Sequence, residues 1–204
     1  MTDTLFYDPR APDRPLRHDP LKAIIAPRPI GWISTINAEG VVNLAPYSFF
    51  NGICSSPWMV AFGNEKASDT LANCEATGEF VHNLVPLALA DAMNKTGHAY
   101  PPGTDEMALA GLASAPSINV RAPRVAASPA SIECKVLQII PLMDLDGKRA
   151  RGTLVIGQVV GVHIDRDYLV DGVFDTVRAA PLARGGNNDY AAMDTIFTMR
   201  RPIL

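Results

Sequence analysis

Apolar and polar positions alternate over several short stretches of the chain, which is the pattern of β-strands with one buried face. The apolar stretches 30–36 and 41–50 flank the turn-forming residues 37–40, so together they predict a β-hairpin. Short strands linked by turns indicate a mainly β, antiparallel barrel or sandwich rather than a parallel sheet. Further strands are predicted at 58–62, 79–85, 130–140, 152–164 and 195–199.

A few short helices are predicted between these strands. Residues 68–77 predict one helix, because Ser68 or Asp69 can cap its start and Gly78 can end it. A second helix is predicted at 86–94, where a proline occupies the tolerant first turn. The long stretch 95–129 is expected to be mostly loop, with one turn of helix near 105–110.

The N-terminal segment differs from the rest in its proline content. Six prolines fall within the first 29 residues, and each removes a backbone donor, so residues 1–22 are expected to form an irregular arm. No repeat, low-complexity tract or linker divides the chain. The sequence therefore predicts a single domain over residues 1–204.

Charge and hydropathy narrow the classes of partner. The 204 residues carry 18 Lys and Arg against 21 Asp and Glu, without a basic cluster, so nucleic acid and anionic membrane are not expected as partners. No apolar stretch reaches the roughly 18 residues that a membrane-spanning helix needs. The N-terminus lacks the apolar core of a secretory signal, which favours a cytoplasmic protein. Cys54, Cys74 and Cys134 are too far apart for a zinc motif and are expected to be buried.

Common catalytic motifs are missing from the sequence. The histidines His18, His82, His98 and His163 are isolated, so they do not predict a metal centre, and no metal ligand is assigned. No serine lies in a Gly-x-Ser-x-Gly elbow, and neither a dinucleotide glycine fingerprint nor a phosphate-binding P-loop occurs. No catalytic side chain is predicted. These observations leave a binding protein, or an enzyme whose cofactor carries the chemistry.

Three segments suggest a ligand, and each has a simpler structural interpretation. At residues 66–70, hydroxyls and backbone amides meet a helix start, which suits a phosphate but equally a plain helix cap. At 45–51, Pro46 marks an edge or bulged strand among aromatic and polar residues, which suits a flat heteroaromatic ring or an ordinary half-buried strand. Residues 181–190 form a polar loop that is either a ligand contact or simple surface.

Several of these segments, in order and spacing, resemble the flavin reductase-like family. The resemblance extends over about residues 20–202 and includes the segments 27–35, 43–51, 69–83, 106–112 and 182–186. It implies an FMN-binding split β-barrel, Greek-key-like and dimeric, with FMN in a groove at the interface of a homodimer. The motifs that carry the resemblance are independent of the periodicity that predicts the strands, and both indicate a mainly β protein.

The resemblance also implies which residues contact the flavin. Ser34 and Thr35 would lie on a strand beside FMN. Ser68, Thr70 and the nearby Lys66 would hold the phosphate, although many relatives have a basic residue at the position of Ser68. Arg184 and Tyr190 would reach the flavin from the second subunit or close the groove. The ring would be lined mainly by the segment Pro46, Tyr47, Ser48, Phe49, Phe50 and Asn51, and the matching segments add Trp32, Asn94 and Lys95.

The implied activity is that of a flavin reductase, with NADH or NADPH as co-substrate. The nicotinamide nucleotide would transfer a hydride to FMN, and a monooxygenase is a candidate partner for the reduced flavin. Three alternatives stay open on the sequence. The chain could be a flavoprotein electron carrier without efficient NAD(P)H oxidation, a binding or regulatory module for haem or a deazaflavin, or a structural dimer that has lost its ligand.

Overall fold

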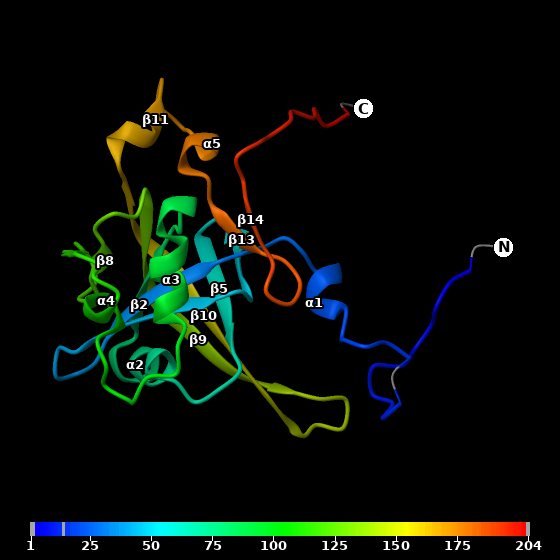
Figure 1. Cartoon of the computed structure of the whole chain (residues 1–204). Helices are drawn as coiled ribbons and strands as arrows, with labels where there is room; N and C mark the ends of the chain where they lie inside the picture. Colours follow the sequence, from blue (N-terminus) through cyan, green and yellow to red (C-terminus); the bar gives the residue numbers. More distant parts are fainter. Residues whose placement is uncertain (1–2, 14, 203–204) are drawn as a thin grey trace.

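The computed structural model describes residues 3–13 and 15–202. Its main feature is one seven-stranded antiparallel sheet with the strand order β3-β2-β6-β9-β10-β5-β4 (Figure 1). The mainly β prediction is therefore confirmed. The strands are β2 (Gly31–Ile36), β3 (Val42–Tyr47), β4 (Phe50–Ser55), β5 (Trp58–Asn64), β6 (Glu79–Asn83), β9 (Ala130–Met143) and β10 (Arg149–Ile164).

The two edge strands of this sheet, β3 and β4, follow one another directly along the chain. Only Ser48 and Phe49 separate them, so the sheet must curl until its two edges meet, which makes a barrel that is split at these residues. The backbone N–H of Gly63 donates to the carbonyl of Phe49 at 2.7 Å beside the split. Pro46 lies in an edge strand, as predicted, where its missing donor breaks no inner ladder.

Two apolar cores lie on opposite faces of the sheet. Inside the barrel, the Phe80 ring packs edge-on against Phe62 with centroids 5.3 Å apart. Outside, Trp32 is fully buried and donates from Nε1 to Thr96 Oγ1 at 2.9 Å. The inner core contains Ile33, Val60, Phe62, Cys74, Phe80, Cys134 and Val155, and the outer one Ile30, Trp32, Leu44, Val85, Met93, Met107, Val125 and Leu182.

The helices cover the barrel and largely match the prediction. Helix α2 (Asp69–Thr77) is capped by Ser68, whose Oγ accepts from the Leu71 N–H, and ends at Gly78 with a φ of 68°. The second predicted helix begins as the 3₁₀ turn η1 (Leu87–Leu89) and continues as α3 (Ala90–Thr96). No helix in the described residues is long and apolar enough to cross a membrane. The other helices are α1 (Leu21–Ile24), α4 (Glu106–Leu109), η2 (Arg166–Tyr168) and α5 (Thr176–Ala179).

A small second sheet packs near the split in the barrel. It has the order β1-β13-β14 and pairs the N-terminal segment with the region expected to be a polar loop. That region forms a hairpin instead, with only residues 185–189 in the turn. The remaining strands are β1 (Arg28–Pro29), β7 (Ser114–Ala115), β8 (Arg124–Val125), β11 (Leu169–Val170), β12 (Val173–Phe174), β13 (Leu182–Arg184) and β14 (Tyr190–Ala192).

Three sequence predictions about secondary structure are corrected. Residues 195–199 form no strand, because no neighbouring strand offers a ladder to their β-favouring side chains. The single strand predicted over 41–50 breaks at Ser48, where the barrel splits. Helix α1 begins at Leu21, inside the segment predicted to be irregular. Of the cysteines, Cys74 and Cys134 are buried as expected and Cys54 is half-buried.

Glu133 on β9 fixes a long loop against the back of the sheet. Its side chain is fully buried, and its carboxylate accepts from the backbone N–H groups of Ile118 at 2.7 Å and Asn119 at 2.6 Å. His163 Nε2 on β10 lies 2.5 Å from the same carboxylate. Burial by itself would raise the pKa of Glu133, but the hydrogen bonds from His163 and the two amides outweigh it and hold that pKa below its ordinary value.

Candidate functional site

One cavity, called the main cavity below because it gathers the most residues predicted from the sequence, lies alongside β3, between the split in the barrel and the start of α2. It has a volume of about 420 Å³, within the usual size range of small-molecule pockets. The opposite wall is the loop 97–102, and Lys22 reaches the rim from α1. Seven of the residues predicted from the sequence line it: Pro46, Tyr47, Ser48, Phe49, Lys66, Ser68 and Thr70.

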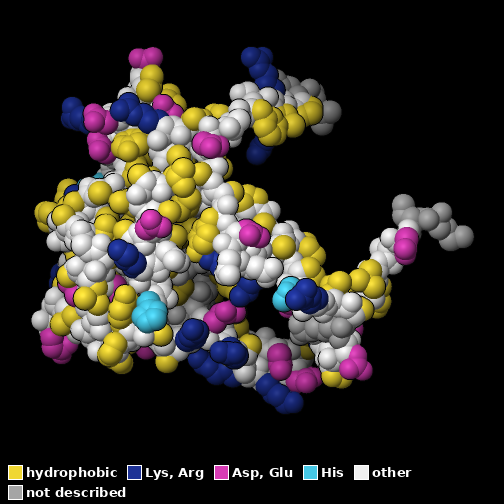
Figure 2. All heavy atoms as spheres, in the orientation of Figure 1, with side chains coloured by type: hydrophobic (Ala, Val, Ile, Leu, Met, Phe, Trp, Pro, Cys, Tyr) yellow, Lys and Arg dark blue, Asp and Glu magenta, His cyan; other side chains and the backbone are white. Residues whose placement is uncertain are grey.

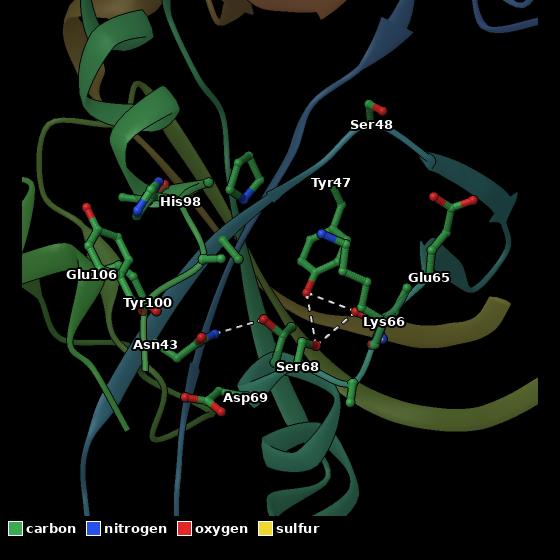
Figure 3. A pocket seen from close by; sticks show the side chains of 18 of the residues that line it. Asn43, Tyr47, Ser48, Glu65, Lys66, Ser68, Asp69, His98, Tyr100 and Glu106 are labelled. Carbon is green, nitrogen blue, oxygen red and sulfur yellow. Dashed lines mark hydrogen bonds between the residues drawn. The ribbon is translucent and has the colours of Figure 1, made fainter. Parts of the chain in front are cut away.

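The α2 end of this cavity is a cluster of hydroxyl and amide groups (Figure 3). Ser68 Oγ donates to Asn64 Oδ1 at 2.9 Å while it caps the helix, so the helix-cap interpretation of this serine is correct. The Tyr47 hydroxyl lies 3.2 Å from Asn64 Oδ1 and 3.4 Å from Ser68 Oγ. Burial raises the pKa of Tyr47, although hydrogen bonds from Ser68 and Thr70 oppose this, so its hydroxyl stays protonated at neutral pH.

One backbone donor and one cation remain available at this end. The N–H group of Asp69 belongs to the first turn of α2 and has no hydrogen-bond partner within the described chain, whereas Thr70 is fully buried. The Asp69 carboxylate is engaged elsewhere, because its Oδ2 accepts from the Gly103 N–H at 2.7 Å. Lys66 makes no ion pair with any described residue. Together, a free amide, a helix start and a lysine can bind an anion.

Three predicted site residues lie too deep to reach a ligand in this cavity. The side chains of Trp32, Ser34 and Thr35 are fully buried, and none lines a described cavity. Ser34 Oγ donates to the Pro123 carbonyl at 2.5 Å. Thr35 Oγ1 accepts from the amide of Asn43, which also donates to Thr70 Oγ1 at 2.8 Å. The resemblance to the family implied that Ser34 and Thr35 lie beside FMN, but β2 lies inside the sheet. Thr35 instead helps to orient Asn43, and Ser34 bonds to Pro123.

Two further cavities meet the main one at Ser48, which lines all three. One, of about 200 Å³, is lined by Asn94, Arg184 and Tyr190 and shares Pro46 with the main cavity. The other, of about 440 Å³, is lined by Phe50 and Asn51 together with apolar residues of α1 and β4. Lys95 is exposed on α3 and lines none of the described cavities.

Arg184 and Tyr190 therefore reach the site within a single chain. The Arg184 guanidinium lies 4.4 Å from the centre of the Tyr190 ring and donates to its hydroxyl. Phe50, which was predicted to line the flavin ring, is mostly committed to the barrel, because it stacks on His82 with centroids 4.3 Å apart. Burial lowers the pKa of His82 to about 4, so this histidine is neutral at physiological pH.

Some cavity residues were not predicted from the sequence. Glu106 is nearly buried, and its Oε2 accepts from the Leu44 N–H at 3.0 Å. Burial raises the pKa of Glu106, and the negative charges of Asp69 and Asp105 raise it further, while the Leu44 hydrogen bond opposes the change. Glu106 lies in a segment that resembles the family, but that segment alone assigned it no role. Other polar residues of the cavity that the sequence analysis gave no role are Lys22, Asn43, Asn64, Glu65, His98 and Tyr100.

Comparison with known proteins identifies the family. A family model described as a flavin reductase like domain matches residues 25–178, about three quarters of the chain. The chain belongs to this family. A relative from Halalkalibacterium halodurans, the uncharacterized protein BH2278, is 34% identical over 185 residues, which cover 88% of each chain.

Solved structures agree with this assignment. Nitrilotriacetate monooxygenase component B from Bacillus cereus superposes with a TM-score of 0.89 and 27% identity, covering 98% of this chain and 100% of that one. A protein with a split barrel domain from Shewanella frigidimarina gives a TM-score of 0.79 at 20% identity, covering 89% and 90% of the two chains. The predicted split β-barrel of the flavin reductase-like family is therefore confirmed.

Proposed function

We propose that the chain is an FMN-binding oxidoreductase that transfers a hydride from NADH or NADPH to the flavin. One observation carries the proposal: the main cavity joins an anion-binding helix start to the wall Pro46–Phe49 in a flavin reductase-like split barrel. Membership of the family supports a flavin as ligand. The neighbour with a TM-score of 0.89 is a monooxygenase component, which supports delivery of reduced flavin to a monooxygenase.

The residues at the α2 end fit a phosphate group. The N–H group of Asp69, together with the Lys66 ammonium, would hold it, while Ser68 keeps the helix start rigid through its cap. The Asp69 carboxylate is held by the Gly103 N–H but keeps its negative charge, so the Lys66 ammonium would have to offset that charge as well. Glu106 disfavours a second negative charge nearby, so the phosphate is placed at Lys66 rather than at the Glu106 wall.

The segment around Ser48 fits the ring end of a flavin. Pro46 and Phe49 offer apolar surface there, and the backbone of Ser48, which lies outside both β3 and β4, would meet the polar edge of a ring. Bound FMN would supply the hydride-accepting centre. The chain contributes binding, orientation and exclusion of water, and hydride transfer calls for no acid or base from the protein.

A homodimer is part of this proposal. The N-terminal arm and the C-terminal segment project from the body of the chain and carry hydrophobic side chains (Figures 1 and 2). Phe6 is 88% exposed and Phe197 is 84% exposed in the isolated chain. Exposed apolar side chains of this size support burial against a second copy. Sedimentation equilibrium at micromolar concentration tests it, and a monomer there would contradict the dimer.

The activity is tested with the purified protein and added FMN. Quenching of flavin fluorescence measures binding, and anaerobic stopped-flow absorbance follows the oxidised flavin after NADH or NADPH is added. We expect binding followed by bleaching within seconds. Flavin that binds but bleaches only with dithionite would contradict the reductase and indicate an electron carrier, and absence of binding would contradict the flavin site itself.

A charge-neutral variant tests the phosphate end. Lys66→Met should weaken FMN binding by about tenfold, because it removes a charge-assisted contact to phosphate. Lys148→Met is the matched control, since Lys148 lies exposed in the turn between β9 and β10, away from the cavity, and loses the same charge. Riboflavin, which lacks the phosphate, should bind both variants and the unmodified protein equally. Equal FMN affinity in the two variants would refute the role of Lys66.

A further inference from the structure

Two arginines face each other across one rung of the small sheet beside the site. Arg28 on β1 is paired directly with Arg184 on β13, so their side chains leave the same face of the sheet. Directly opposed like charges destabilise a strand pair. Neither guanidinium forms an ion pair with a carboxylate in the described part of the chain. The pair therefore holds two positive charges without a counter-charge.

The first of these arginines is buried. Arg28 is only 6% exposed, and its guanidinium donates to the carbonyls of Lys22, Ile25 and Gly185. Its Nε is buried and has no hydrogen-bond partner. Backbone carbonyls solvate the cation but do not neutralise it, and a buried charge is costly unless an opposite charge lies near. Arg28 thus keeps the neighbouring space electropositive.

The second arginine, Arg184, places its own charge at the wall of a cavity. Arg184 donates to the Tyr190 hydroxyl and the Asn187 carbonyl, which leaves other N–H groups of its guanidinium without partners. It lines the 200 Å³ cavity that meets the main cavity at Ser48, and the unpaired amide of Asn94 lines the same space. Among the described residues, no carboxylate lines this cavity. An adjoining cavity of about 350 Å³ shares Asn94, Arg184 and Tyr190 with this one, and Asp91 lines only that adjoining cavity.

We propose that Arg184, supported by the charge of Arg28, forms an anion subsite that holds the diphosphate bridge of the nicotinamide nucleotide. This inference rests on the proposed function, which names NADH or NADPH as the hydride donor. It assigns Arg184 to the second reactant rather than to FMN, because its cavity lies on the far side of Ser48 from Lys66 and the α2 start. A guanidinium fork beside an amide donor matches the oxygens of a diphosphate.

ADP-ribose is the probe, because it carries the diphosphate bridge and has no nicotinamide ring to donate a hydride. Isothermal titration of the FMN-loaded protein should give an affinity that falls about tenfold or more in Arg184→Met. Arg184→Lys keeps the charge but loses the planar guanidinium fork. Its affinity for ADP-ribose should lie between those of the unmodified protein and Arg184→Met. Arg178→Met is the matched control, because Arg178 also stacks on an aromatic ring, Tyr168 at 5.6 Å, but lies outside the described cavities.

Steady-state kinetics give an independent readout. The KM for NADH should rise in Arg184→Met while kcat and the FMN dissociation constant stay close to those of the unmodified protein. Unchanged ADP-ribose affinity in Arg184→Met, or loss of FMN binding in that variant, would overturn the subsite. The same titration on FMN-free protein separates the two proposals: ADP-ribose binding that depends on Arg184, in a protein that never binds FMN, would keep the subsite and reject the proposed function.

Discussion

Replacement of Glu133 by glutamine tests how one buried carboxylate holds the loop that closes the back of the barrel. The side chain keeps its size, but the charge is lost and only one acceptor oxygen remains for the N–H groups of Ile118 and Asn119. The N–H of either Ile118 or Asn119 then faces the amide NH₂ of the glutamine, which cannot accept a hydrogen bond. A buried donor left unpaired costs about 1–3 kcal/mol, and the surviving bond loses the added strength of a charged acceptor. We expect the free energy of unfolding to fall by roughly 3 kcal/mol at pH 7.

Urea denaturation followed by tryptophan fluorescence measures this change, provided that the dependence on urea is equal in both proteins. Glu39→Gln is the control, since Glu39 is exposed in the turn between β2 and β3, and its effect should stay within about 0.5 kcal/mol. A loss below about 1 kcal/mol in Glu133→Gln would refute the anchoring role of this carboxylate.

The pH dependence gives a second check on Glu133. Its pKa in the folded protein lies below its ordinary value of about 4.3, so the stabilisation is complete above that value and is lost as the pH falls through the folded pKa. The difference between the unmodified protein and Glu133→Gln should therefore shrink below about pH 4. A difference that stays constant from pH 7 to pH 3 would contradict the assignment of the stabilisation to the ionised carboxylate.

Three further substitutions test the core and the cavity. Gly157→Ala should lower the free energy of unfolding by about 1–3 kcal/mol in thermal denaturation, because a Cβ there would lie 2.5 Å from the buried Phe80 ring. Ser68→Ala should cost about 1 kcal/mol, since the Leu71 N–H loses its cap; an unchanged melting temperature would contradict this. Glu106→Gln should strengthen FMN binding at pH 8. Because the pKa of Glu106 is raised in the folded protein, the free energy of unfolding rises as the pH falls from the raised pKa to the ordinary one. Urea titrations at different pH values should show that Glu106→Gln lacks this rise.

The sequence by itself determined most of the secondary structure, because the signals involved are local. The helix over 69–77 is specified by a serine cap at one end and a glycine that adopts a positive φ at the other. The edge position of β3 follows from Pro46, which lacks the donor that an inner strand needs. The ordered motifs also indicated the family. Residues 195–199 show where local signals fail, because their composition favours a strand but no strand within residues 3–13 and 15–202 pairs with them.

The tertiary structure alone decided which residues share the site. Thr35 is buried beside Asn43 and Asn73 of α2, and Ser34, on the other face of β2, is buried against the Pro123 carbonyl. Glu106 enters the cavity only because α4 packs against β3. The opposition of Arg28 and Arg184 depends on a register between segments more than 150 residues apart. Such contacts are set by strand pairing and barrel closure, which depend on the summed burial of the whole chain rather than on any local pattern.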